Sequence, residues 1–308
     1  MLIPMSLDDS TALSIAWQHP PAWTRATADD ALCEATLRAG AALALIDQMV
    51  RRDTPWRGAW LDRLALEAAA ASLRLLRRPE DVAGIRDAHH LCRPGDDPGP
   101  AGRIYALWQR LAAHRPSLQS DDVAHAANRC GISWTDDLEA IRAAAVDAAP
   151  TSTPLAAALT LLASHCVERL DALPVLLWLA DTLLARRAGW PVGVPLLARA
   201  GGPLTRADAT TDDRRRVVAS YARAAIGALD AARAIAEQGA ILQSVAGKLR
   251  AKGAPAVVSA LLAQDAVGPG LRVRDLSDRG LRRLYDRLAA LGAVRELTGR
   301  GTFRLYGL

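Results

Sequence analysis

Apolar residues recur at three- and four-residue intervals along most of the chain, which is the period of an α-helix with one buried face. Leu66, Ala70 and Leu73 follow this spacing. Strand signals are scarce, because aromatic residues make up 4% of the chain and valine and isoleucine are spread thinly among alanine and leucine. The pattern predicts helices at about residues 28–50, 60–76, 80–91, 101–113, 120–130, 135–148, 154–165, 171–188 and 212–252.

Two segments rich in proline and glycine, residues 93–103 and 189–204, interrupt the helical pattern. The most apolar stretch, Leu173 to Ala185, contains Asp181. It is shorter than the roughly 20 residues that a membrane span needs, so we expect a buried helix and no membrane partner. No repeat of fixed period is evident. We therefore predict an all-α fold whose body is an irregular multi-helical bundle.

The pattern changes after Lys252. A short helix, a break, a second helix and two short strands form the order of a winged helix-turn-helix, which we place at residues 253–308. The expected pieces are helices at 254–264 and 278–291, a brief turn of helix within 267–276, and strands at 293–297 and 302–305 joined by the glycine-bearing turn 298–301.

The helix at residues 278–291 has the sharpest pattern in the chain. Leu281, Leu284, Leu288 and Leu291 form one apolar stripe, and Ser277 stands at the N-cap position. Arginines project from the opposite side, where a recognition helix contacts base edges and phosphates. Together with arginines before the helix and in the wing, they give the predicted DNA-binding residues Arg272, Arg274, Arg279, Arg282, Arg283, Arg300 and Arg304.

Two points about this unit stay open at the level of sequence. Asp286 is either a cytosine reader or a partner of Arg282 or Arg283 within the helix. The unit as a whole is either a DNA-binding module or a structural winged helix that serves dimerisation or docking, with its arginines solvated.

Three blocks of sequence resemble a bacterial family known as domain of unknown function 1403: IRDAHHLCRPGDDPGPAGR, LADTLLARRAGWPVGVPLL and RLYDRLAALGAVRELTGRGTFRLYGL. The resemblance covers nearly the whole chain. It implies an intact bacterial protein with a helical body and a winged-helix tail, and it implies no activity. The tail is also similar to winged helices of bacterial regulators and of Fic-type proteins, but the histidine and glycine-rich loop of the Fic motif do not occur.

The charge of the chain is concentrated at its end. Residues 270–308 contain nine arginines and four acids, so they account for the whole net charge of +5. All but two of the 38 basic residues are arginine, which suggests a GC-rich genome. The four cysteines are far apart and the N-terminus lacks a secretory or transit pattern, so we expect a cytoplasmic protein without disulfides.

The loop at residues 93–103 is the second candidate site. Arg93, Asp96, Asp97 and Arg103 could bind a ligand, a partner or a metal, or the loop is simply held by arginine–aspartate pairing and helix caps. It lacks the lysine of a phosphate-binding Walker loop. No cofactor is expected.

The remaining reactive residues predict neither catalysis nor metal binding. His89, His90 and Cys92 diverge around a helix, and His165 with Cys166 lacks an orienting acid. Glu67 and Asp181 are lone acids on apolar helices, and we expect each to pair with an arginine of the body; an enzyme remains conceivable only if both face one cleft.

The chain contains eight tryptophans and one phenylalanine. We interpret them as large core side chains. Trp17 and Trp23 alternatively belong to a docking peptide for a partner or for a second copy of the chain.

The sequence therefore predicts a body at residues 1–204, a long connecting helix or helices at 205–252 and a winged helix at 253–308. The predicted function is duplex DNA binding in regulation or DNA maintenance, without enzymatic activity. The alternative is a helical scaffold whose winged helix docks a protein, and a homodimer is compatible with both.

Overall fold

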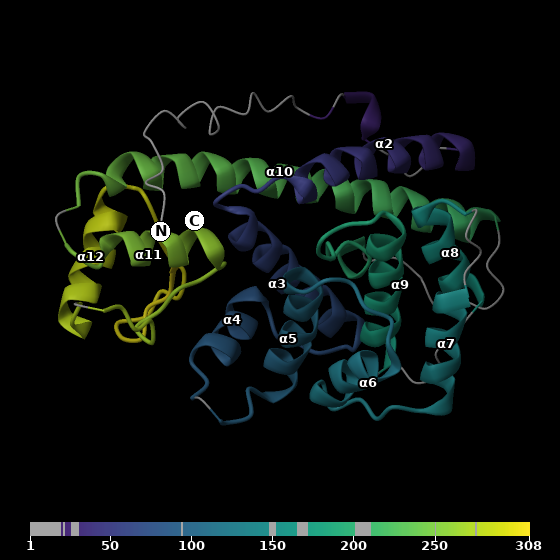
Figure 1. The fold of residues 1–308 in the computed structure, drawn as a ribbon, viewed down its shortest axis with the longest axis horizontal. Helices are drawn as coiled ribbons and strands as arrows, with labels where there is room; N and C mark the ends of the chain where they lie inside the picture. The colour runs from purple at the N-terminus through teal and green to yellow at the C-terminus, as the bar shows by residue number, and fades with distance from the viewer. Residues whose placement is uncertain are drawn as a thin grey trace, which may run out of the picture.

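The computed structural model describes residue 20 and residues 22–25, 31–93, 95–147, 152–164, 172–200, 211–249, 251–274 and 276–308. These residues form α-helices, two short 3-10 helices and one two-stranded antiparallel sheet (Figure 1). In chain order the elements are η2 (Ala22–Thr24), α2 (Leu32–Arg51), α3 (Arg57–Leu75), α4 (Val82–His90), α5 (Gly99–Ala113), α6 (Ser120–Arg129), α7 (Asp136–Asp147), α8 (Pro154–Ser164), α9 (Leu173–Arg187), η4 (Ala198–Ala200), α10 (Thr211–Ala246), α11 (Ala254–Ala263), α12 (Asp278–Ala290), β1 (Arg295–Glu296) and β2 (Tyr306–Gly307). The mostly helical fold is confirmed.

The 36-residue helix α10 runs along the length of the molecule, and α2 packs beside it (Figure 1). Alanines face this contact, because Ala35, Ala39 and Ala42 of α2 and Ala225 and Ala232 of α10 are fully buried. Small side chains let two helix backbones approach closely, and the helical spacing keeps them on one face.

Helix α3 is the centre of the body and contacts α4, α5, α10 and α11. Its apolar residues are buried nearly all round, as expected for a helix that is surrounded by others. Two buried indoles tie it to its neighbours. Trp60 donates its ring N–H to the carbonyl oxygen of Ala228 in α10, and the ring N–H of Trp108 in α5 reaches the hydroxyl of Ser72.

Helices α7, α8 and α9 pack together at the end of the molecule opposite α11 and α12 (Figure 1). Every side chain from Leu173 to Ala185 is buried, which confirms the predicted buried helix. A search of the described helices finds none with the length and apolar character needed to cross a membrane.

The tryptophans behave largely as predicted. Trp56, Trp60, Trp108, Trp178 and Trp190 are buried in the core. Trp23 is 55% exposed, and Trp17 lies outside the described residues. The indole N–H groups of Trp178 and Trp190 are satisfied by the carbonyl oxygen of Leu107 and the carboxylate of Asp47.

The C-terminal residues form α11, α12 and a short hairpin. Arg295 pairs with Gly307 and Glu296 with Tyr306, and Tyr306 also forms an isolated bridge with Val267 on its other side. The brief turn of helix expected within residues 267–276 is not among the described elements, which there are a bridge at Val267 and turns at residues 269–270 and 274, and residue 275 lies outside the described residues. The Gly268-Pro269-Gly270 sequence disfavours a helix in the first part of this segment, since proline and glycine disfavour a helix interior.

The second strand also differs from the prediction. It begins at Tyr306 rather than within residues 302–305, so the loop that joins the strands is longer than expected. Two local features bend the chain out of the ladder. The carboxylate of Glu296 accepts hydrogen bonds from the N–H groups of Thr298 and Gly299, and Phe303 has a φ of 54°.

Asp181 is the most enclosed acid of the body. Its carboxylate accepts hydrogen bonds from the N–H groups of Leu196 and Leu197, at 2.8 and 2.9 Å, and from the hydroxyl of Tyr221 at 3.3 Å. Among the described residues no arginine forms an ion pair with Asp181, contrary to the expectation, and main-chain amides satisfy this carboxyl group instead. Burial raises the pKa of Asp181 to about 7, and these hydrogen bonds only partly oppose it.

We predict that Asp181→Asn removes a pH dependence of stability. Below the ordinary pKa of 3.8 the group is protonated in both states. As the pH rises toward 7, the carboxyl group loses its proton in the unfolded state but keeps it in the folded state. The free energy of unfolding of the wild type therefore falls by up to about 1.4 kcal/mol per pH unit. The unfolding free energy of the variant minus that of the wild type should therefore rise between about pH 4 and 7 and then level off. Urea titrations measure this difference, and a constant value across that range would contradict the assignment.

Candidate functional site

Helix α12 buries one side and exposes the other. Leu281, Leu284 and Leu288 are buried as predicted, and the hydroxyl of Ser277 caps the helix by accepting from the N–H of Gly280 at 3.2 Å. Leu291 is an exception to the predicted stripe, because it is 46% exposed. The helix ends at Ala290, and Gly292 turns the chain with a φ of 67°.

The exposed side of α12 carries Arg279, Arg282, Arg283 and Arg287. Within the described part of the chain, no carboxylate lies at ion-pair distance from any of the four. Figure 1 shows α12 at the outer end of the molecule, away from the helices of the body. Four guanidinium groups therefore face solvent from one helix, which is a surface that attracts anions.

The other predicted DNA-binding arginines surround α12 but are partly engaged. Arg272 forms an exposed ion pair with Asp278 at 3.0 Å, and Arg274 is exposed. Arg304 donates to the carbonyl oxygen of Arg300 at 2.9 Å. Arg300 itself forms an ion pair with Asp87 of α4, so the loop between β1 and β2 is attached to the body.

Asp286 lies beside Arg304, with 3.9 Å between nitrogen and oxygen, and it accepts from the hydroxyl of Tyr306 at 3.5 Å. The expected pairing with Arg282 or Arg283 within the helix is not what the structure has. The carboxylate instead points toward the hairpin, which leaves those two arginines free of it.

A buried carboxylate joins the C-terminal residues to the body. Asp265, directly after α11, is enclosed and forms ion pairs with Arg63 of α3 and, at 2.8 Å, with Arg86 of α4. Arg63 also donates to the carbonyl oxygen of Leu308 at 3.2 Å. Burial opposes ionisation of Asp265, but the two guanidinium groups outweigh it and lower its pKa.

A second carboxylate completes this joint. Asp62 of α3 accepts a hydrogen bond from the main-chain N–H of Asp265 at 2.9 Å, and its other oxygen accepts from Tyr105 and Gln109 of α5 at 2.8 and 2.7 Å. The backbones are equally close, because a Cβ atom on Gly58 would lie 2.5 Å from the carbonyl oxygen of Ala263.

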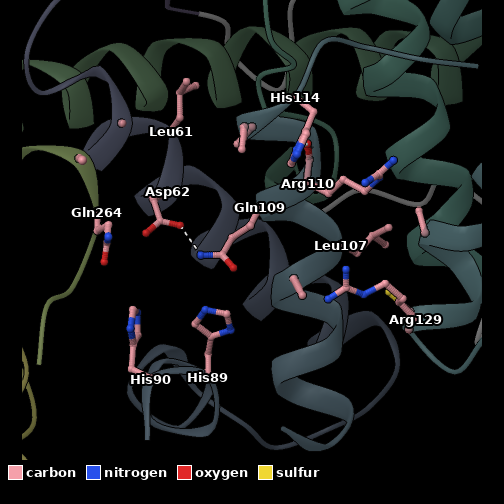
Figure 2. Close-up of a pocket in the computed structure, with 17 residues that line it drawn as sticks. Leu61, Asp62, His89, His90, Leu107, Gln109, Arg110, His114, Arg129 and Gln264 are labelled. Atoms are coloured by element: carbon pink, nitrogen blue, oxygen red, sulfur yellow. Dashed lines mark hydrogen bonds between the residues drawn. The ribbon is translucent and has the colours of Figure 1, made fainter. Parts of the chain in front are cut away.

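A cavity of about 650 Å³ opens beside the joint (Figure 2). Its polar lining comes from α3, α4, α5, α6 and the residue after α11. The polar groups include Asp62, His89, His90, Gln109, Arg110, His114, Arg129 and Gln264.

Burial sets the charge of this lining. It lowers the pKa of His89, and it lowers that of His90 to about 4 with help from His89. Both imidazoles are therefore neutral at neutral pH. Burial also raises the pKa of Asp62, although hydrogen bonds from Gln109, Asp265 and Tyr105 oppose that rise. The uncharged polar groups near the joint are thus the two imidazoles and the side-chain amides of Gln109 and Gln264, which lie beside Asp62.

The described residues of the loop at 93–103 show the arginine–aspartate pairing and helix capping that the simpler interpretation of this loop predicts. Asp97 accepts from the N–H of Gly99 at 2.9 Å and forms a two-pronged ion pair with Arg103, at 2.9 and 2.7 Å. The N–H of Asp96 donates to the carbonyl oxygen of Arg93 at 3.0 Å. The four predicted loop residues are therefore close together, and the pairs they form hold the loop at the start of α5.

The other candidate residues do not assemble into a reactive site. In the described ranges, no three histidine, cysteine, aspartate or glutamate side chains meet as a metal site. His165 and Cys166 lie outside the described residues. The expected arginine partner of Glu67 is confirmed, since Arg199 lies 2.7 Å away. Glu67 lines a cavity of about 310 Å³ whereas Asp181 is enclosed, so the two acids do not share a cleft.

The model of one protein family, described as protein of unknown function (DUF1403), matches residues 10–308. The chain belongs to the DUF1403 family. The resemblance seen in the sequence is thereby confirmed over nearly the whole chain. No curated protein matches it.

The residues that sequence reasoning missed in this DUF1403 protein are Asp62, Gln109 and Asp265. Each occurs in a segment that looks ordinary by itself, and Asp62 and Asp265 are far apart in the chain. The one sequence signal near them was the His89-His90 pair, which we considered only as a metal ligand.

We predict that Asp265→Asn lowers the unfolding free energy by about 3 kcal/mol or more, because removing one partner of a buried ion pair leaves the other charges uncompensated. Asp53→Asn is the matched control, since Asp53 is 96% exposed in its ion pair with Arg57. Urea denaturation should show a large loss for the first variant and almost none for the second. Equal effects of the two substitutions would show that Asp265 is no more important than a surface acid.

Proposed function

We propose that this protein binds duplex DNA through residues 253–308, with α12 as the recognition helix of a winged helix-turn-helix. The observation that carries the proposal is the exposed face of α12, where Arg279, Arg282, Arg283 and Arg287 stand without a carboxylate partner among the described residues. An α-helix fits the major groove, and arginine contacts both phosphates and the edge of guanine.

The short sheet supports the winged-helix arrangement. After α11, Val267 is bridged to Tyr306, and β2 lies between this bridge and β1. The hairpin loop reaches α12 through Arg304, which lies 3.9 Å from Asp286, and we assign this loop as the wing. The segment between Val267 and Ser277 has turns in place of a helix in its described residues, so α11 and α12 are the two helices of the unit.

The distribution of charge supports the same function. Residues 270–308 contain the net charge of the whole chain. Arg272, Arg274 and Arg304 lie on the same unit and would contact phosphates, which positions a protein on DNA without reading the sequence. Arg300 would exchange Asp87 for a phosphate when the wing engages DNA.

In this proposal the protein is a binding protein rather than an enzyme, and it acts in regulation or DNA maintenance. A cytoplasmic location agrees with the free thiols of Cys33, Cys92 and Cys130. A symmetric dimer would present two recognition helices about 34 Å apart to a palindromic site.

A second candidate function is docking of a protein partner through the same unit. Two exposed apolar side chains favour it, Phe303 in the wing loop at 68% and Leu291 after α12 at 46%. Large apolar groups in solvent often mark protein contacts.

We predict that the full chain binds a duplex with an affinity that falls steeply between about 50 and 200 mM salt. The combined variant Arg279→Ala, Arg282→Ala, Arg283→Ala should weaken binding by about tenfold or more and should reduce the slope of log K against log salt by about 0.9 for each lost phosphate contact. Fluorescence anisotropy with a labelled random duplex measures both quantities.

The matched control is Arg52→Ala, Arg214→Ala, Arg216→Ala, which removes the same charge from exposed arginines outside residues 253–308. It should bind DNA nearly as well as the wild type. If both variants lost the same DNA affinity, the loss would be explained by the change in net charge alone. Full binding by the folded α12 variant would reject α12 as the recognition helix and favour protein docking.

A further inference from the structure

The cavity beside Asp62 has the size and lining of a small-molecule site. Its volume of about 650 Å³ lies within the roughly 300–1,000 Å³ that such sites occupy. The lining is mainly apolar, from residues such as Leu61, Leu107 and Ala126, with a few polar groups that converge on the space. The cavity lies away from the exposed face of α12, so the DNA proposal makes no use of it.

One end of the cavity carries uncharged side chains beside Asp62. Gln109 donates its Nε2 to Asp62, which leaves its carbonyl oxygen as an acceptor (Figure 2). Gln264 on the opposite side is exposed and has both an amide donor and an acceptor. Side-chain amides of this kind pair with the donor and acceptor edges of nucleobases.

The two histidines add to this end. His89 and His90 contact each other edge to face with ring centres 4.9 Å apart, and both are neutral because burial lowers their pKa values. Nε2 of His90 is buried and has no hydrogen-bond partner in the described structure. Because buried polar atoms are normally paired, this imidazole is available to a ligand after a rotation of its ring.

The other end of the cavity is basic. Arg129, at the end of α6, is exposed, and its guanidinium group is directed into the space in Figure 2. Arg110 also lines the cavity but is engaged by Asp122 at 3.2 Å. Among the described lining residues, one guanidinium group without an ion pair and several uncharged amide and imidazole groups fit a ligand with one anionic group and a neutral head.

We propose that this cavity binds a nucleoside monophosphate, with the base between Gln109, His90 and Gln264 and the phosphate on Arg129. Binding would bridge the body and the C-terminal unit, because Gln264 directly precedes the joint residue Asp265. Any effect on DNA affinity rests on the proposed function, whereas nucleotide binding is measured without DNA, so the two proposals can fail separately.

Isothermal titration calorimetry of the full chain with AMP, GMP, CMP and UMP tests the inference. At least one of them should bind with one molecule per chain. Arg129→Gln should weaken that binding by about tenfold or more, since it removes a charged hydrogen bond to the phosphate. Gln264→Ala should weaken it as well, and its exposed position leaves the fold intact.

Arg52→Gln is the matched control, because Arg52 is exposed and does not line the cavity. It should bind the nucleotide as the wild type does. The inference is overturned if none of the four nucleotides binds, or if Arg129→Gln and Arg52→Gln bind equally well. Inorganic phosphate that competes as strongly as the nucleotide would also overturn it, since the site would then recognise only an anion.

Discussion

The buried carboxylate of Asp265 holds the two parts of this protein in one arrangement. An ionised acid inside a protein is stable only when opposite charges and hydrogen bonds replace water. Arg63 and Arg86 supply the charges, and each comes from a different helix of the body. The main-chain N–H of the same residue donates to Asp62. Helices α3, α4 and α11 are therefore held in one relative orientation. A rotation of α11 would separate the buried carboxylate of Asp265 from Arg63 and Arg86.

This joint also accounts for the neighbouring cavity. Asp62 is held by donors from α5 and from residue 265, so its side chain forms one wall while the histidines of α4 form another. The backbones of α3 and α11 touch at Gly58, which brings Gln264 to the rim. The cavity is thus a consequence of how the C-terminal unit is attached, and a molecule bound in it would contact both sides of the attachment.

Local physics made most of the helices predictable. Helical periodicity located the described helices to within a few residues, and an apolar run without polar faces correctly indicated that α9 is buried. The joint was not predictable, because Asp62 and Asp265 pair over 203 positions and neither has a local pattern. The hairpin was partly mispredicted for a related reason: the side chain of Glu296 competes with the ladder for main-chain N–H groups, and periodicity contains no such information.

The use of arginine separates α12 from the rest of the chain. A composition with almost no lysine gives every surface arginines by default, so their presence alone argues little. Whether an arginine has a carboxylate partner is more informative about its role. In the body, Arg63, Arg86, Arg103 and Arg199 each pair with a carboxylate. Others, such as Arg52, are exposed. On α12 four arginines share one solvent face, and Asp286 of the same helix lies beside Arg304 and Tyr306. Four like charges on that face repel one another, and an external polyanion would relieve this repulsion.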